Sequence, residues 1–223
     1  MRPIYKQVDL PETKRLNLDQ AKAVLRFKPD IIFLEWPQDI KNSPVAFNKY
    51  PPLKKPKGLV KKIQKGLLKK DSLKKHPWAV ADAVLFDNIS KLWSEGHDVF
   101  LFPVDAQREL TAENYLLWKK MYPAVKKQWL WWVRIYLREK IMAENIERAF
   151  KKYTHKDKPK VLVLLQSFHW RHVRFLLSHP SKSRVWKYYF GRFSGITPKT
   201  IAGDIYKENR VFYKYWKKYA DFH

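Results

Sequence analysis

Short apolar runs alternate along the chain with longer segments in which apolar residues recur at helical spacing. Three continuously apolar runs of strand length cover residues 31–34, 99–102 and 161–165, and a shorter strand is predicted at 4–8. Strands that are apolar at every position are typical of a parallel sheet with both faces covered. The intervening segments repeat apolar side chains at i, i+3 and i+4, which predicts α-helices at 18–27, 77–94, 123–153 and 169–177.

Four alternations of strand and helix predict an α/β fold, in which helices flank a mainly parallel sheet. Two segments depart from this pattern. Five prolines interrupt residues 37–57, so a long loop is expected there, followed by a short basic helix at 58–75. The last stretch is aromatic, basic and helical in its spacing. We therefore expect an α/β core at 1–178 that carries a basic loop-and-helix insertion at 41–76, and a basic, aromatic helical extension at 179–223.

The composition is that of a folded protein without thiol chemistry. Of the 223 residues, 45% are hydrophobic and 16% aromatic, which is enough to build a core. The absence of Cys excludes a disulfide scaffold, Cys-ligated zinc and a Cys nucleophile. No apolar run approaches the ~20 residues that span a bilayer, and the first residues lack the apolar segment of a secretory signal. We therefore expect a cytoplasmic protein. The absence of Cys and the preference for Lys over Arg are compatible with a thermophilic source.

Positive charge is concentrated in two parts of the chain. Lys and Arg number 46 against 21 Asp and Glu, which gives a formal net charge of +25. Residues 41–76 hold 12 Lys opposed only by Asp71, and residues 182–223 sum to +7. A field of this size is self-repelling unless a polyanion neutralises it. The distribution favours a surface for phosphates over the alternative of a merely solvated, Lys-rich surface.

The C-terminal stretch interleaves cations with aromatic rings, as in Arg184–Phe193 and Tyr213–Tyr219. Cations pair with phosphates, and aromatic rings stack on unpaired bases. We therefore predict a protein that binds nucleic acid or a nucleoprotein such as a ribosome, mainly through the nucleic-acid backbone. The predicted contact residues are basic and lie in both charged segments: Lys54, Lys55, Lys57, Lys61, Lys62, Lys65, Lys69, Lys70, Arg184, Lys187, Arg192, Lys214 and Lys217.

A cluster of tryptophans in the predicted helix at 123–153 allows other partners. Trp129, Trp131 and Trp132 lie close to two lysines. An anionic membrane surface is one alternative for this cluster and for the basic helix at 58–75, although the charge pattern favours nucleic acid. The tryptophans also fit a hydrophobic core or the interface of a homodimer. A scaffold for protein–protein contact is therefore a further alternative.

Polar residues follow the predicted strands at their carboxyl ends, the edge where chemistry collects in parallel sheets. Together with an arginine from the helix at 123–153, they form a predicted catalytic set: Glu12, Glu35, Asp105, Arg138 and His169. A carboxylate–His pair can run general acid–base catalysis, and an arginine can stabilise a developing anion. The alternative is structural, with Glu35 and Arg138 in an ion pair and His169 satisfied at a helix start.

His169 and His172 form a candidate metal pair. They stand three residues apart, so they share one face of the predicted helix at 169–177. Two carboxylates plus a histidine from the catalytic set also suit a divalent metal. The sequence identifies no cofactor.

Four segments of the predicted core match, in order, the motifs of one known superfamily. They are the strand Pro29–Glu35 (PDIIFLE), the segment Ser94–Asp105 (SEGHDV, then Asp105), the helix Arg138–Ile146 (REKIMAENI) and the segment Lys160–Val173, which contains His169. In this order they resemble the superfamily of erythromycin esterases, ChaN haem-binding lipoproteins, TraB proteins and Tiki metalloproteases. The resemblance covers about residues 1–178. It implies the fold of that superfamily and a hydrolase site at the carboxyl edge of the sheet.

One motif of that superfamily differs in this chain. Its active esterases and Tiki proteins carry Gly-Glu-x-His or Gly-x-x-His after the first strand, where this chain has Pro11-Glu12-Thr13-Lys14. Glu12 matches the family glutamate, whereas Lys14 stands in place of the histidine. A protonated lysine cannot ligate a metal. We therefore expect a nucleic-acid- or nucleoprotein-binding protein on a degenerate core of this superfamily; the alternative is a metal-dependent or acid–base hydrolase.

Overall fold

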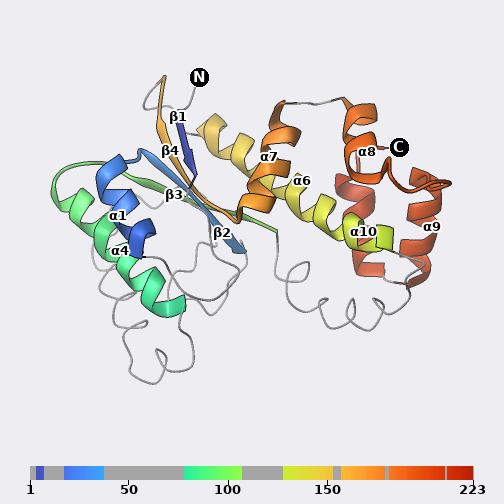
Figure 1. Cartoon of the computed structure of the whole chain (residues 1–223), viewed down its shortest axis with the longest axis horizontal. Helices are drawn as coiled ribbons and strands as arrows, with labels where there is room; N and C mark the ends of the chain where they lie inside the picture. Colours follow the sequence, from blue (N-terminus) through green and yellow to red (C-terminus); the bar gives the residue numbers. More distant parts are fainter. Residues whose placement is uncertain are drawn as a thin grey trace. The chain divides into compact units, whose positions relative to one another are not determined.

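The α/β class predicted from the sequence is confirmed by the structure (Figure 1). The structure is a computed structural model and describes residues 4–7, 18–37, 78–106, 128–152, 157–178, 181–208 and 210–222. The chain forms two compact units, each made of two stretches. The first unit comprises Met1–Val104 and Arg148–Trp170, and the second comprises Asp105–Glu147 and Arg171–His223. The predicted basic insertion at 41–76 lies outside the described residues.

Four parallel strands form the sheet in the spatial order β1-β4-β2-β3. The strands are β1 (Ile4–Gln7), β2 (Ile31–Pro37), β3 (Phe100–Asp105) and β4 (Lys160–Leu164). The two central strands are in register, with Leu34 opposite Leu164. Asp30 joins three strands at their amino ends. Its carboxylate accepts the backbone N–H of Lys160 (2.7 Å), and its carbonyl accepts the N–H of Phe100 (2.9 Å).

The described helices follow the predicted periodicity, with one difference near the C-terminus. They are α1 (Leu18–Phe27), α4 (Trp78–Ser94), α6 (Gln128–Lys152), α7 (Ser167–Ser178), α8 (Lys182–Phe190), α9 (Pro198–Glu208) and α10 (Arg210–Tyr219). The predicted helical stretch at 183–220 is thus three helices. Gly195 adopts φ +71, which favours glycine, and Pro198 occupies the first position of α9. Within the described ranges, no helix combines the length and the apolar character that crossing a membrane requires.

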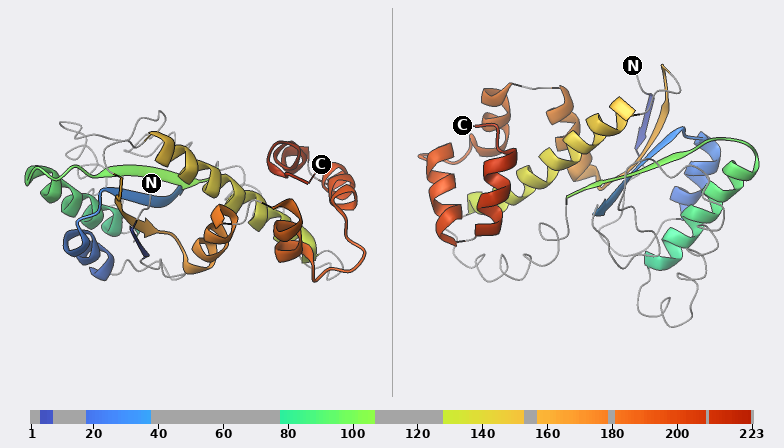
Figure 2. Two further views of the ribbon diagram at one scale, coloured as in Figure 1. Left: turned by 90° about the horizontal axis from the view of Figure 1, so that it is seen from above. Right: turned by 180° about the vertical axis from the view of Figure 1, so that it is seen from behind.

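Both faces of the sheet are covered in the first unit, as continuously apolar strands require. On one face, Ile32 and Leu162 belong to the same buried cluster as side chains of α1 and α4. These two helices pack against each other (Figure 2). On the other face, the ring of Phe33 contacts those of Phe102 and Phe150, with centroids 6.1 and 5.5 Å apart. Phe150 lies in the last turns of α6, so this helix contributes to the second cover.

The helices of the second unit close around an aromatic core. Tyr136 of α6 contacts Tyr189 and Phe190 of α8 and Trp216 of α10, with ring centroids 5.0 to 6.4 Å apart. Ile201 of α9 is buried in the same cluster. The second unit therefore has a core of its own, built from all three C-terminal helices and α6.

The tryptophans of α6 pack in or against this core. Trp129 is buried in it, and Trp131 and Trp132 are partly buried against it. This agrees with the core alternative for the tryptophan cluster. A homodimer through this helix stays a prediction.

Candidate functional site

Glu35 and His169, two of the predicted catalytic residues, lie together at the carboxyl edge of the sheet. Glu35 follows the apolar part of β2, and His169 stands in the first turn of α7, after β4. Because β2 and β4 are neighbouring parallel strands, both residues emerge at the same edge. His169 Nε2 lies 3.9 Å from Glu35 Oε1; His169 is buried, and the Glu35 side chain is 9% exposed. Glu35 Oε2 accepts the backbone N–H of Gln166 (2.8 Å), which fixes the start of α7 against β2.

Asp105 and Arg138, two more of the predicted catalytic residues, form an ion pair within the second unit. Asp105 ends β3 and is only 2% exposed. Arg138 of α6 donates to both of its carboxylate oxygens, from Nε (2.7 Å) and from Nη2 (2.5 Å). Asp105 Oδ1 also accepts the backbone N–H of Ala106 (2.7 Å). This two-point, charge-assisted contact holds the carboxylate in one orientation. The ion pair between Arg138 and Glu35 stays a prediction.

A buried carboxylate that was not singled out in the sequence lies inside the second unit. Glu139 is 0% exposed; His172 Nδ1 lies 3.0 and 2.8 Å from its two oxygens, and the Tyr189 hydroxyl donates to Oε2 (2.6 Å). Burial, followed by the charge of Glu139, raises the pKa of Tyr189 well above its ordinary value. The sequence does carry a signal for this cluster. Glu139 falls in the apolar stripe of α6 between Ile135 and Met142, where a carboxylate needs buried partners.

The two histidines predicted as a metal pair contact different carboxylates. His169 lies beside Glu35, and His172 lies beside Glu139. Among the residues that the structure describes, no three His, Cys, Asp or Glu side chains gather closely enough to hold a metal ion. A metal role for the histidines stays a prediction. Glu12, the remaining predicted catalytic residue, lies outside the described ranges.

Exposed cations crowd the C-terminal helices of the second unit. The described residues between 171 and 222 include 12 Lys and Arg but only three Asp and Glu. All 12 cations are exposed: Arg171, Arg174, Lys182, Arg184, Lys187, Arg192, Lys199, Lys207, Arg210, Lys214, Lys217 and Lys218. None of them forms an ion pair with an acidic residue in the described part of the chain, and Asp221 pairs instead with Lys140 of α6.

Five of the predicted nucleic-acid contacts belong to this set of 12 exposed cations: Arg184, Lys187, Arg192, Lys214 and Lys217. The other eight predicted contacts, between Lys54 and Lys70, lie outside the described residues. The structure adds seven exposed cations that the sequence-based prediction missed. Six of them lie outside the two interleaved segments Arg184–Phe193 and Tyr213–Tyr219, whereas Lys218 lies inside the second segment.

α10 separates its cations from its aromatic rings. The cations stand at i, i+4, i+7 and i+8, which places them on one side of the helix: Arg210, Lys214, Lys217 and Lys218. The opposite side packs into the aromatic core through Phe212, Tyr215 and Trp216. The cations therefore form a stripe that faces solvent, defined here as the α10 stripe.

Arg192 lies on the aromatic core and is still exposed. Its guanidinium carbon is 3.6 Å from the ring centroid of Trp132 and 5.0 Å from that of Phe193. Partial burial lowers the pKa of Arg192, but a guanidinium stays protonated in proteins. Arg192 thus presents a fixed cation held by stacking rather than by a carboxylate.

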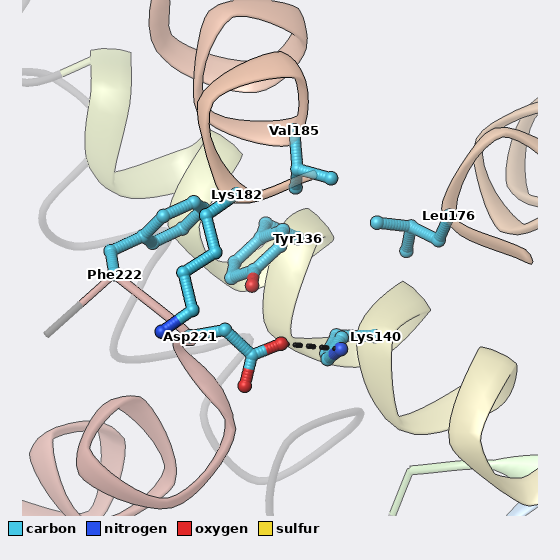
Figure 3. Close-up of a pocket in the computed structure, with 7 residues that line it drawn as sticks. All are labelled: Tyr136, Lys140, Leu176, Lys182, Val185, Asp221 and Phe222. Carbon is cyan, nitrogen blue, oxygen red and sulfur yellow. Dashed lines mark ion pairs between the residues drawn. The ribbon is translucent and has the colours of Figure 1, made fainter. Parts of the chain in front are cut away.

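A cavity of about 30 Å³ lies in the second unit, large enough for about one water molecule (Figure 3). Its lining is Tyr136, Lys140, Leu176, Lys182, Val185, Asp221 and Phe222. Lys140 and Asp221 form an ion pair (2.5 Å) on its polar side. Burial, followed by the Asp221 charge, raises the pKa of Tyr136. A space of about one water molecule is too small for a phosphate group, so this cavity is not a phosphate site. The ion pair in its lining attaches Asp221 to Lys140 of α6.

Comparison with known proteins gives no relative: no family model, curated protein or solved structure matches the chain. The functional conclusion therefore depends on the chemistry of these residues.

Proposed function

We propose that the protein binds nucleic acid through the exposed cations of its C-terminal helices. The observation that carries this proposal is the set of 12 exposed cations between residues 171 and 222, which form no ion pair with an acidic residue that the structure describes. Protein surfaces usually intersperse both signs of charge. A surface with one sign attracts a polyanion, and the polyanion supplies the missing counter-charge.

The α10 stripe is suited to a phosphate backbone. Arg210 and Lys218 are eight residues apart, which corresponds to about 12 Å along the helix axis. Duplex DNA carries roughly seven phosphates over that length. Every nucleotide brings a charge whatever its base, so binding by such a stripe requires no sequence recognition. A nucleoprotein that exposes its nucleic acid would present the same phosphates.

The proposal is tested by anisotropy titrations of fluorescein-labelled single-stranded and duplex oligonucleotides with the full chain. We expect binding at ~50 mM salt that weakens by about 50- to 150-fold at ~200 mM if four phosphates are neutralised. The absence of binding to either probe at ~50 mM would overturn the proposal.

A matched pair of variants distinguishes an effect of the C-terminal surface on affinity from an effect of the net charge of the chain. K214Q/K217Q removes two charges of the α10 stripe. K28Q/K91Q removes two exposed lysines of the first unit, which pair with Glu95 and Asp87. We expect the first variant to reduce the slope of log affinity against log salt by about 1.4 to 1.8, and the second to leave it nearly unchanged. Equal effects would contradict a C-terminal binding surface.

The lysines predicted as contacts at 54–70 extend the same proposal. K61Q/K62Q is expected to weaken binding in the same titration, with a smaller salt slope. An unchanged slope would remove this segment from the binding surface.

A second candidate function is hydrolysis of an ester or peptide bond, on a core related to the esterase and Tiki superfamily. It is favoured by the largely buried pair of Glu35 and His169 at the carboxyl edge of the sheet, an arrangement suited to acid–base catalysis. The test is hydrolysis of p-nitrophenyl acetate by the wild-type chain and by E35Q and H169Q, with R26Q on the exposed side of α1 as control. Hydrolysis that persists in both variants would exclude these residues from the reaction.

A further inference from the structure

The C-terminal helices expose two tyrosine rings among their cations. Tyr188 is 41% exposed and Tyr206 is 52% exposed. The other Phe, Tyr and Trp residues described between 171 and 222 are buried or partly buried. Most of the aromatic residues that the sequence interleaves with cations therefore build the core. These two rings are the ones available to a ligand.

Tyr188 is held rigidly at the surface of α8. Its ring stacks on that of Phe175, with centroids 4.0 Å apart and planes at 14°. The rings of His172 and Tyr189 meet it nearly at right angles, at 5.3 and 5.2 Å. A ring fixed in this way loses little conformational entropy when a flat ligand stacks on its exposed surface.

Tyr206 is placed in a similar way at the end of α9. Its ring meets that of Tyr213 of α10 edge-on, with centroids 5.0 Å apart and planes at 75°. The guanidinium carbon of Arg210 lies 6.0 Å from the ring centroid. α9 and α10 pack against each other, so both helices position this ring.

The two tyrosines share a pattern of neighbouring charge. Each has a lysine beside it in the chain and an arginine four residues later: Lys187 and Arg192 around Tyr188, Lys207 and Arg210 around Tyr206. All four of these cations are exposed. A ring flanked by cations can stack on a base while the cations hold the adjoining phosphates.

We infer that the nucleic acid bound by this surface is single-stranded, and that its unpaired bases stack on Tyr188 and Tyr206. The inference rests on the proposed function, because the cations supply most of the affinity. In a duplex the bases already stack on one another, whereas the bases of a single strand can turn onto a protein ring. Every base has a flat face, so little base preference is expected. RNA and DNA single strands share this chemistry.

The experiment measures affinities of the full chain for four probes at one salt concentration. The probes are labelled single-stranded RNA and single-stranded DNA of ~20 nucleotides, a DNA duplex of the same length, and inorganic polyphosphate, which carries charge without bases. Y188L/Y206L removes both rings, and Y188F/Y206F keeps them. Y5L is the control, because Tyr5 is an exposed tyrosine of the first unit.

We expect Y188L/Y206L to bind single strands at least about 30-fold more weakly than the wild-type chain, with duplex and polyphosphate affinities unchanged. Y188F/Y206F and Y5L should bind like the wild type. Tighter binding to single-stranded RNA than to single-stranded DNA, or the reverse, supports the inference and shows which of the two nucleic acids this surface prefers. If circular dichroism shows that the double variant is unfolded, Y206L alone provides the same comparison.

Three results would overturn the inference. They are a wild-type preference for the duplex, single-strand affinity that Y188L/Y206L leaves intact, and an equal loss of affinity for polyphosphate. If K214Q/K217Q still weakens binding in these cases, the proposed function stands and only base stacking fails. No binding to any probe defeats both.

Discussion

His172 and Glu139 meet inside the second unit, with Nδ1 of the imidazole 2.8 Å from Oε2 of a carboxylate that solvent does not reach. Tyr189 donates a hydrogen bond to the same oxygen (2.6 Å). The three residues come from α7, α6 and α8, so one buried charge fixes three helices together. A buried carboxylate is stable only while its partners remain, because desolvation of an uncompensated charge is costly.

Removal of His172 should therefore destabilise the chain strongly. H172L replaces the imidazole with an apolar side chain of similar size, so Glu139 loses a hydrogen-bonding partner. We expect the free energy of unfolding in urea to fall by about 3 kcal/mol. R174A changes an exposed residue of the same helix and should alter it by no more than about 0.5 kcal/mol. If H172L were as stable as R174A, Glu139 would not depend on the imidazole.

Alkaline pH should destabilise the second unit through its buried tyrosines. Burial raises the pKa of Tyr136 and of Tyr189 above the ordinary value of 10.0, with Asp221 and Glu139 as the next causes. A raised pKa in the folded state means that folding favours the protonated tyrosine. Its contribution to stability is complete below pH 10.0 and is lost as pH rises further. Urea unfolding on both sides of that pH measures this loss.

Y189F provides the control for the alkaline titration. In the folded chain it should leave the tyrosinate absorbance just above pH 10.0 unchanged, because Tyr189 is still protonated there. In concentrated urea the same substitution should remove the signal of one tyrosinate. A folded-state signal that falls in Y189F would mean that Tyr189 ionises normally.

Arg138 should stabilise Asp105 through geometry as well as charge. In R138M, the carboxylate of Asp105, which is 2% exposed, keeps the hydrogen bond from the backbone N–H of Ala106 but loses its cation. We expect the free energy of unfolding to fall by about 3 kcal/mol. R138K keeps the charge but not the two-point contact, so its loss should be intermediate, about 1 to 2 kcal/mol. R148M, at an exposed position of α6, is the comparison and should cost less than about 0.5 kcal/mol. Equal stability of R138K and the wild type would exclude the geometric contribution.

The last residues of the chain should contribute through packing more than through charge. Phe222 contacts the rings of Tyr136 and Trp186, with centroids 5.2 and 5.0 Å apart. F222A should lower the free energy of unfolding by about 2 kcal/mol, less than for a fully buried phenylalanine. D221N removes a half-exposed ion pair with Lys140 and should cost less than about 1 kcal/mol. The reverse order of the two effects would show that charge dominates.

The sheet and most helices could be predicted from the sequence because their patterns are local. The run at 31–34 is apolar at every position since both faces of β2 are covered. The division of residues 183–220 into three helices also has local signals, in Gly191, Gly195 and Pro198.

The candidate sites were predictable only where topology decides proximity. Parallel strands end at one edge of the sheet, so the sequence could group Glu35 with His169 there; the structure adds that β2 and β4 are neighbours. Glu139 meets partners 33 and 50 residues away, on helices whose packing no local pattern encodes. The same limit applies to the exposed tyrosines, because helical packing decides which rings of an aromatic segment reach solvent.

The discontinuity of the second unit has a consequence during translation. The aromatic side of α6 is synthesised well before α8, α9 and α10, which later cover it. A nascent chain that has not yet reached Lys182 therefore presents Trp129 and Tyr136 without their final neighbours. Truncated chains of this protein should accordingly aggregate or bind chaperones, even when every strand of the sheet has already been made.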